Sequence, residues 1–148
     1  MHRYYKLRQW GQVTVEFVAA LCFILPIVAV VGWAIYEASQ AYEIYCVLNQ
    51  SASVAARRLA IAYGQDATGT MANPGPAFNQ ITYGNIVNNA QQFSIPTGGW
   101  KPTSNPPTVT VQCTFQSDQH GCPHFPAPDP LNLGSNFTLV GQATYRLE

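Results

Sequence analysis

Hydrophobic side chains are concentrated near the start of the chain. Residues 17–36 contain no Asp, Glu, Lys or Arg and are mostly large and apolar. A helix rises about 1.5 Å per residue, so this stretch would be roughly 30 Å long, which matches the hydrocarbon core of a bilayer. Core helices of soluble proteins are seldom so uniformly apolar. The pattern therefore predicts a transmembrane helix over residues 12–36, in which Pro26 should introduce a bend.

A helical pattern continues beyond the predicted span. Small and apolar residues recur at alternating spacings of three and four, and a second apolar stripe runs beside them. This spacing predicts an extracytoplasmic helical spine over residues 37–64, which Gly64 is suited to end. The Ala-rich seam can pack against the chain's own outer domain, against neighbouring subunits, or against both. The seam positions are Ala38, Ala41, Tyr45, Leu48, Ala52, Ala55, Leu59 and Ala62, and the second stripe is Ile44, Val47, Val54 and Ile61.

Residues 65–148 have the pattern of a small α+β domain. Residues 77–93 show a moderate helical spacing and predict a second helix. Residues 108–115 and 137–147 alternate apolar and polar side chains, which is typical of half-buried strands. We expect these strands to pair antiparallel against the long helix. The predicted fold class is α+β: a long N-terminal helix, half transmembrane and half extracytoplasmic, and a small domain with one further helix and an antiparallel β-hairpin or small sheet.

The charges are unevenly distributed, although the formal net charge is zero. Residues 1–11 contain Arg3, Lys6 and Arg8 and no acid, whereas the rest of the chain is net negative. Positive charge before a span and little after it predicts a cytoplasmic N-terminus and an extracytoplasmic C-terminal domain. The expected partner is therefore the lipid bilayer. Nothing resembles the basic surface of a nucleic-acid-binding protein, and no nucleic-acid partner is expected.

A cleavable secretory signal peptide is one alternative explanation of the N-terminal pattern. Such a peptide has an apolar region of about 7–15 residues and then a small-x-small cleavage site. The span here is longer, and it runs directly into the helical pattern of residues 36–50. A plain signal anchor remains a second alternative, but it requires neither Gly11 nor Glu16.

The residues around the start of the span resemble a known family. A basic leader, Gly11, four residues, Glu16-Phe17 and an apolar run are similar to the processing pattern of type IV pilin-like proteins. The form G-Q-x-x-V-E-F followed by A-x-x-x-x-x-L-P resembles the TadE-like minor pilins of tight-adherence (Tad, Flp-type) pilus systems. The run VLNQSASVAARRLAIAYG at residues 47–64 and the closing LVGQATYRLE are also similar to that family.

This resemblance implies a route of processing and assembly. A prepilin peptidase would cut between Gly11 and Gln12, so that residues 1–11 are a prepilin-type leader. Glu16 would become the fifth residue of the mature chain, next to Phe17, and its carboxylate would pair with the new α-amino group of Gln12 or of a neighbouring subunit. The implied location is the bacterial inner membrane, with possible entry into a surface pilus. The implied partners are the peptidase, other pilin-like subunits and the assembly machinery, and the implied role is adhesion and surface colonisation. The chain is longer than major Tad pilins, which favours a minor component.

The cysteines fall into two groups. Cys22 lies inside the span and Cys46 lies on the spine, and both are expected to act as small hydrophobic residues. Cys113 and Cys122 are separated by eight residues in a loop-rich segment. Outside the cytoplasm such a pair is expected to form a disulfide, which would stabilise the fold by roughly 2–3 kcal/mol.

The sequence contains no recognisable catalytic motif, so we expect neither an enzyme nor a cofactor. Two alternatives to the disulfide stay open, a pair of free thiols and a metal site. The alternating His120, Cys122 and His124 suggest the metal site, but zinc-finger spacing is absent and no metal is expected. Arg57-Arg58 is interpreted as a solvated face or as a pairing partner between subunits. Two functions remain: a processed minor pilin or pseudopilin, or a permanently anchored single-pass protein with an extracytoplasmic binding domain.

Overall fold

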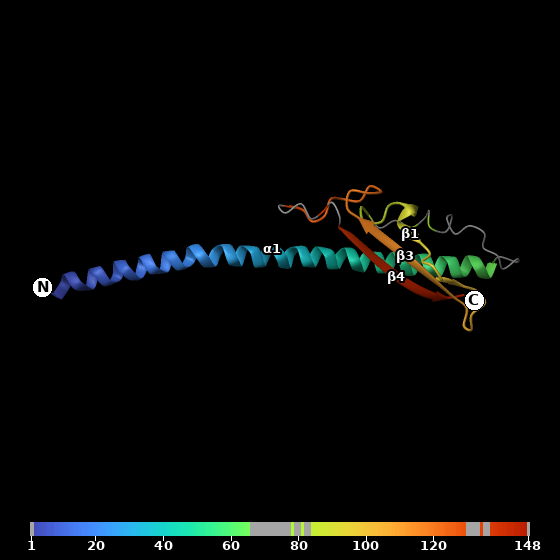
Figure 1. Cartoon of the computed structure of the whole chain (residues 1–148), viewed down its shortest axis with the longest axis horizontal. Helices are drawn as coiled ribbons and strands as arrows, with labels where there is room; N and C mark the ends of the chain where they lie inside the picture. Colours follow the sequence, from blue (N-terminus) through green and yellow to red (C-terminus); the bar gives the residue numbers. More distant parts are fainter. Residues whose placement is uncertain are drawn as a thin grey trace. The chain divides into compact units, whose positions relative to one another are not determined.

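The computed structural model describes residues 2–65, 78, 81, 84–129, 134 and 137–147, with side chains described from residue 13 onward. The chain divides into two compact units, Met1–Gln40 and Ala41–Glu148. The first consists of helix alone in its described part, and the second contains the last turns of the helix and a β-sheet (Figure 1).

The helix α1 extends from His2 to Gln65 and is 64 residues long. It continues through Pro26, although proline has no amide hydrogen and leaves the carbonyl of Cys22 without its usual partner four residues later. The predicted helical span and helical spine are therefore both confirmed as helix.

The sheet of the second unit has four antiparallel strands, and its centre is the long strand β3 (Figure 1). Both short strands pair with one edge of β3, and β4 pairs with the other edge along its whole length, from Thr108 opposite Arg146 to Gln116 opposite Thr138. The predicted antiparallel pair is thus confirmed. The bounds are β1 Phe93–Ser94, β2 Trp100–Lys101, β3 Thr108–Gln116 and β4 Thr138–Arg146.

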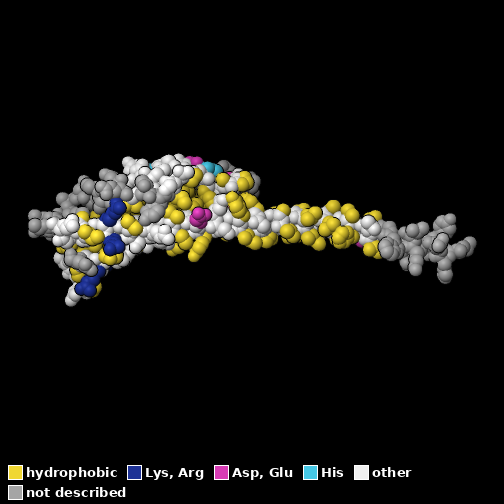
Figure 2. Space-filling view, turned by 180° about the vertical axis from the view of Figure 1, so that it is seen from behind, with side chains coloured by type: hydrophobic (Ala, Val, Ile, Leu, Met, Phe, Trp, Pro, Cys, Tyr) yellow, Lys and Arg dark blue, Asp and Glu magenta, His cyan; other side chains and the backbone are white. Residues whose placement is uncertain are grey.

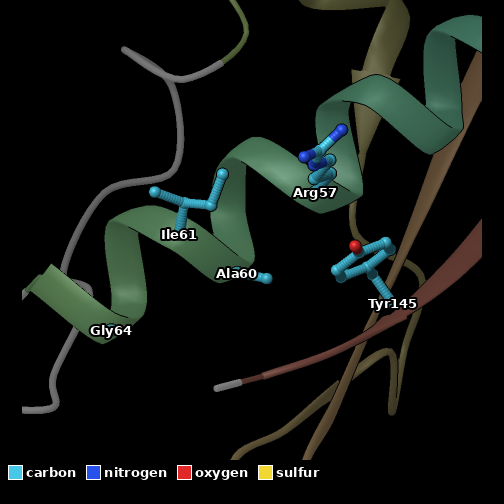
Figure 3. A pocket seen from close by; sticks show the side chains of 5 residues that line it. All are labelled: Arg57, Ala60, Ile61, Gly64 and Tyr145. Carbon is cyan, nitrogen blue, oxygen red and sulfur yellow. The ribbon is translucent and has the colours of Figure 1, made fainter.

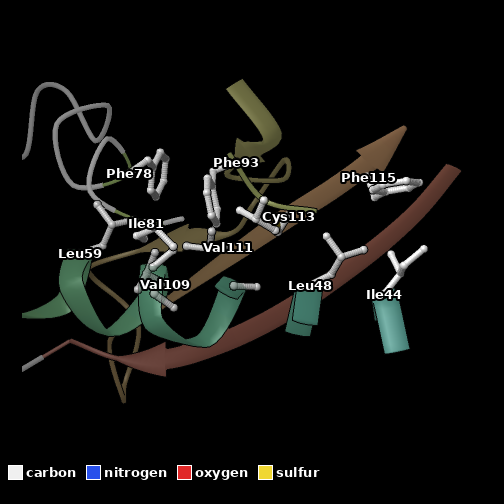
Figure 4. Close-up of a cluster of buried hydrophobic side chains, with 14 of the residues drawn as sticks. Ile44, Leu48, Leu59, Phe78, Ile81, Phe93, Val109, Val111, Cys113 and Phe115 are labelled. Atoms are coloured by element: carbon white, nitrogen blue, oxygen red, sulfur yellow. The ribbon is translucent and has the colours of Figure 1, made fainter. Parts of the chain in front are cut away.

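One face of β3 packs against α1 and forms the core (Figure 4). Burial alternates strictly along β3, as the sequence pattern predicted. The side chains at every second position have no exposed surface, and neither do those that face them from the helix. These residues are Val109, Val111, Cys113 and Phe115 on β3, and Leu48, Ala52, Ala55 and Leu59 on α1. The sheet therefore occupies much of the Ala-rich seam predicted on the spine.

The backbones of α1 and β4 lie very close together at Gly141. A Cβ built there would lie 2.5 Å from the carbonyl carbon of Leu48, so only glycine fits. At the next residue, the backbone N–H of Gln142 donates a hydrogen bond of 3.0 Å to Oδ1 of Asn49. These contacts fix the crossing point of helix and strand within the second unit.

The second α-helix predicted at residues 77–93 is not confirmed. Residues 84–93 form a turn, a single bridge, the 3-10 helix η1 (Ala90–Gln92) and the start of β1. Gly84 has φ +62, which interrupts an α-helix, and Asn89 caps η1 through its side chain. Residues 77, 79, 80, 82 and 83 lie outside the described part. The two-residue strands β1 and β2 were not predicted, because they are too short to show alternation.

Candidate functional site

The first unit presents an apolar helical surface. In α1, the segment Val13–Gln65 contains a window of mean hydropathy 2.6, none of which is buried inside the structure. By length and composition this helix could cross a membrane. Figure 2 shows hydrophobic side chains covering the described part of this helix. Such a surface is unfavourable in water and needs lipid or protein around it. The large exposed side chains include Phe17, Phe23, Ile24, Leu25, Ile27, Val28 and Ile35.

The residues of the predicted processing site lie on this helix. Gly11 and Gln12 are helical in their backbone, and their side chains lie outside the described part. Glu16 is exposed, and Phe17 is 62% exposed. Helical residues four apart share one face, and side chains lean towards the helix N-terminus. The Glu16 side chain is therefore directed towards the turn that begins at Gln12.

Glu16 is the only acidic residue among residues 13–36. A charged carboxylate at the edge of the hydrocarbon costs several kcal/mol by order of magnitude unless a partner or the headgroup region compensates for it. Glu16 is thus a costly residue at this position of an otherwise apolar, exposed helix, and this cost makes it a candidate functional residue.

The predicted disulfide is not formed in the structure. Cys113 and Cys122 are both buried and both free. The reason is local: the Cys113 side chain is packed in the core face of β3, and Sγ of Cys122 lies 3.2 Å from Nε2 of Gln92, which donates to it. Burial raises the pKa of Cys113 to about 12, with a further contribution from Cys122, and burial also raises the pKa of Cys122. Both groups are therefore protonated, weakly nucleophilic thiols.

A histidine bridges two aspartates in the loop after β3. Nδ1 of His124 lies 2.7 Å from Oδ2 of Asp118, and Nε2 lies 3.5 Å from Oδ2 of Asp129. The same Asp129 oxygen accepts a 2.7 Å hydrogen bond from the N–H of Gly134. The hydrogen bond to Asp118 raises the pKa of His124. Sequence reasoning missed this arrangement, because the three residues follow no periodic spacing. Across the residues that the structure describes, no group of three or more His, Cys, Asp or Glu side chains is placed to hold a metal ion.

An open cleft of about 290 Å³ lies between the end of α1 and the end of β4 (Figure 3). It combines one cationic side chain, one phenol and an apolar wall. The sequence singled out Arg57 but gave no sign of its neighbour Tyr145, which is 88 positions away and reaches the cleft only through the fold. The lining residues are Arg57, Ala60, Ile61, Gly64 and Tyr145.

Comparisons with models of known protein families, with curated proteins and with solved structures found no significant match to this chain.

Proposed function

We propose that this protein is a minor pilin or pseudopilin. In this proposal a prepilin peptidase removes residues 1–11, and the mature protein takes part in the assembly of a Tad-type type IV pilus used for adhesion and surface colonisation. The observation that carries the proposal is the exposed Glu16 on an apolar, exposed helix, five residues after Gly11. A simple membrane anchor has no need of either residue at that spacing.

The charge distribution supports a topology for this role. Arg3, Lys6 and Arg8 precede the apolar segment and would hold the N-terminus in the cytoplasm. The unit Ala41–Glu148 would then lie outside the bacterial inner membrane. Cleavage after Gly11 takes place on the cytoplasmic side in this arrangement, before the subunit leaves the bilayer.

Glu16 would act after cleavage. Removal of the leader creates an α-ammonium group at Gln12, one helical turn before Glu16 and on the same face. The two opposite charges then lower each other's cost of entering a low-dielectric environment. The ammonium can come from the same chain or from a neighbouring subunit, and in the second case the pair sets the axial position of one helix against another.

The N-terminus of the mature protein tests this proposal. Intact-mass analysis of the protein purified from its native membrane should show the loss of residues 1–11, and Gly11→Val should leave the precursor uncut. Gly32→Val is the matched control, because it places the same side chain in the same helix where nothing lies within 4 Å. A mature protein that keeps Arg8, or one that is cut beyond Tyr36, would show that the proposal is wrong.

A further inference from the structure

The cleft between α1 and β4 has features that processing and membrane insertion do not use. Arg57, Ala60, Ile61 and Gly64 line it from successive turns of α1, and Tyr145 lines it from β4 (Figure 3). Its volume of about 290 Å³ is at the lower end for pockets that bind ligands, roughly enough for one or two side chains. Ile61 remains 51% exposed, so the apolar wall is open to a partner.

Basic residues gather at the end of the unit that holds the cleft (Figure 2). Lys101 on β2 and Arg146 on β4 flank the same residue of β3, Thr108, so they share one row of the sheet. Among the residues whose side chains are described, neither they nor Arg57 and Arg58 of α1 form an ion pair with a carboxylate. The basic residues of Ala41–Glu148 are Arg57, Arg58, Lys101 and Arg146.

The strand β4 leaves hydrogen-bonding groups open beside this cleft. In an antiparallel pair, alternate residues point their N–H and C=O groups towards the partner strand. The N–H of Leu147 donates to the carbonyl of Pro107, in register with the β3–β4 ladder, so the backbone N–H and C=O groups of the odd-numbered residues of β4 point towards β3. Those of the even-numbered residues point away from β3, and the N–H of Gln142 donates to Asn49. Among the described residues, no strand pairs with the outer edge of β4, which leaves Thr144 and Arg146 open.

The open edge and the cleft lie side by side. The helix crosses β4 where Leu48 and Asn49 contact Gly141 and Gln142. From Asn49 to Arg57 the helix rises about 12 Å. From Gln142 to Arg146 the strand advances about 13 Å. The two distances from the crossing point, along the helix to Arg57 and along the strand to Arg146, are thus nearly equal. The outward backbone groups of Thr144 and Arg146 therefore lie beside Tyr145, which lines the cleft.

We propose that this cleft and the end of the β4 edge dock an extended, acidic segment of another protein. The backbone of that segment adds to β4 beside Thr144 and Arg146, and one of its carboxylate side chains enters the cleft and pairs with Arg57. An arginine guanidinium holds a carboxylate with two parallel hydrogen bonds, and strand addition supplies regularly spaced backbone bonds. This inference is independent of cleavage at Gly11.

The occupant is another protein rather than a second copy of this chain. Among the described acidic residues outside the span, Asp118 and Asp129 both face His124, and a second copy would have to break that contact to offer them. Glu37 and Glu43 lie on α1, and a helix cannot add to a strand edge as an extended segment. The charge at the cleft is positive and uncompensated by described residues, so the complementary segment carries negative charge.

A binding assay with the full-length protein in nanodiscs of neutral lipid tests the proposal. The probe is a fluorescent peptide of sequence Thr-Val-Glu-Val-Thr-Val-Thr, compared with the same peptide carrying Gln in place of Glu and with one N-methylated at alternate backbone nitrogens. Fluorescence anisotropy should show about tenfold weaker binding of the Gln peptide, since a hydrogen bond to a charged group is worth roughly that much. The N-methylated peptide should not bind.

Variants of the protein locate the site. Arg57→Gln should weaken binding of the Glu peptide about tenfold, and Arg57→Lys should weaken it less, because the charge remains but the two parallel bonds are lost. Arg58→Gln is the matched control: it makes the same change at the next residue, which does not line the cleft, and it should leave binding within about twofold. Circular dichroism checks that each variant is folded.

Several results would overturn the proposal. They are no binding of the Glu peptide, equal binding of the Glu and Gln peptides, or an equal loss with Arg57→Gln and Arg58→Gln, which would indicate general attraction between charges. Nanodiscs that contain phosphatidylglycerol provide one more test. If they suppress peptide binding to the wild-type protein, a lipid headgroup occupies the cleft and the proposed partner is wrong.

Discussion

Gly141 on β4 and Leu48 on α1 approach each other so closely that a Cβ on Gly141 would lie 2.5 Å from the Leu48 carbonyl carbon. Real Cβ atoms do not approach backbone this closely, so a side chain at Gly141 would force the backbone of the helix or of the strand to shift. The contact holds the sheet against the helix and sets where the two elements diverge towards the cleft.

Replacing Gly141 by alanine should therefore destabilise the second unit. Overpacking of a tight contact typically costs about 1–3 kcal/mol, and Gly141→Val should cost more. Thermal unfolding in detergent, followed by near-ultraviolet circular dichroism, measures the change. Gly32→Ala is the control, since a Cβ there meets nothing within 4 Å and alanine favours a helix. An unfolding temperature of Gly141→Ala equal to that of the wild type would mean that the contact is looser than the structure has it.

The His124 cluster should make the loop after β3 sensitive to pH. The pKa of His124 is raised by its hydrogen bond to Asp118, so the folded protein binds the proton more tightly than the unfolded chain does. The sign follows directly: this contribution to stability is fully present below the unfolded pKa of about 6.5 and is lost as the pH rises through the folded value.

Nuclear magnetic resonance titration of the His124 ring measures this effect. Asp118→Asn should lower the pKa of His124, and Asp129→Asn should lower it less, because Nε2 lies 3.5 Å from Asp129 and Nδ1 lies 2.7 Å from Asp118. A titration midpoint that does not move in Asp118→Asn would contradict the assigned cause.

The two buried thiols should resist modification in the folded protein. Because burial raises the pKa of Cys113 to about 12, almost no thiolate is present at neutral pH. In detergent that leaves the fold intact, maleimide labelling followed by mass spectrometry should mark Cys46, which is half-buried on α1, before the buried Cys113. Denaturation should then make Cys113 and Cys122 reactive. A pair that stays unreactive after denaturation until a reductant is added would be a disulfide, and the free thiols of this structure would be wrong.

Local patterns in the sequence predicted the elements that are long enough to repeat. The alternation of residues 108–115 predicted both the strand and its buried face. Successive side chains of a strand point to opposite faces, so the apolar positions alone identify the face that is buried. The second helix expected at residues 77–93 rested on a moderate apolar spacing. In the structure Gly84 has a positive φ that interrupts a helix, and Asn89 caps the short 3-10 helix η1 instead. No local pattern could predict the cleft, because Arg57 and Tyr145 line it from elements that are far apart in the sequence and that cross at Gly141. The resemblance at Gly11 and Glu16 concerns chemistry that folding alone does not test.

Glu16 allows the proposed function to be separated from simple anchoring. If the helix were only an anchor, Glu16→Ala would be harmless or mildly stabilising, because it removes a carboxylate from the edge of the hydrocarbon. If the carboxylate pairs with a mature N-terminus during assembly, the same change leaves an ammonium group without its partner where the dielectric is low. Removal of one side of such a pair typically costs about 3–5 kcal/mol, or a thousandfold or more in the association constant.

Membrane insertion and cleavage at Gly11 should survive this change, because neither depends on a charged partner. Glu16→Ala should therefore be processed and remain in the membrane, yet fail to join pilus material or to support pilus production. Glu16→Gln is the matched variant, since it keeps the size and polarity of the side chain and removes only the charge; it should fail in the same way. Fractionation into membrane and sheared surface material, with blotting for this protein and for the major pilin, measures both effects. Normal piliation with Glu16→Ala incorporated like the wild type would show that the carboxylate has no part in assembly. Success of Glu16→Gln alone would instead assign the role to a neutral hydrogen bond and contradict the ion pair.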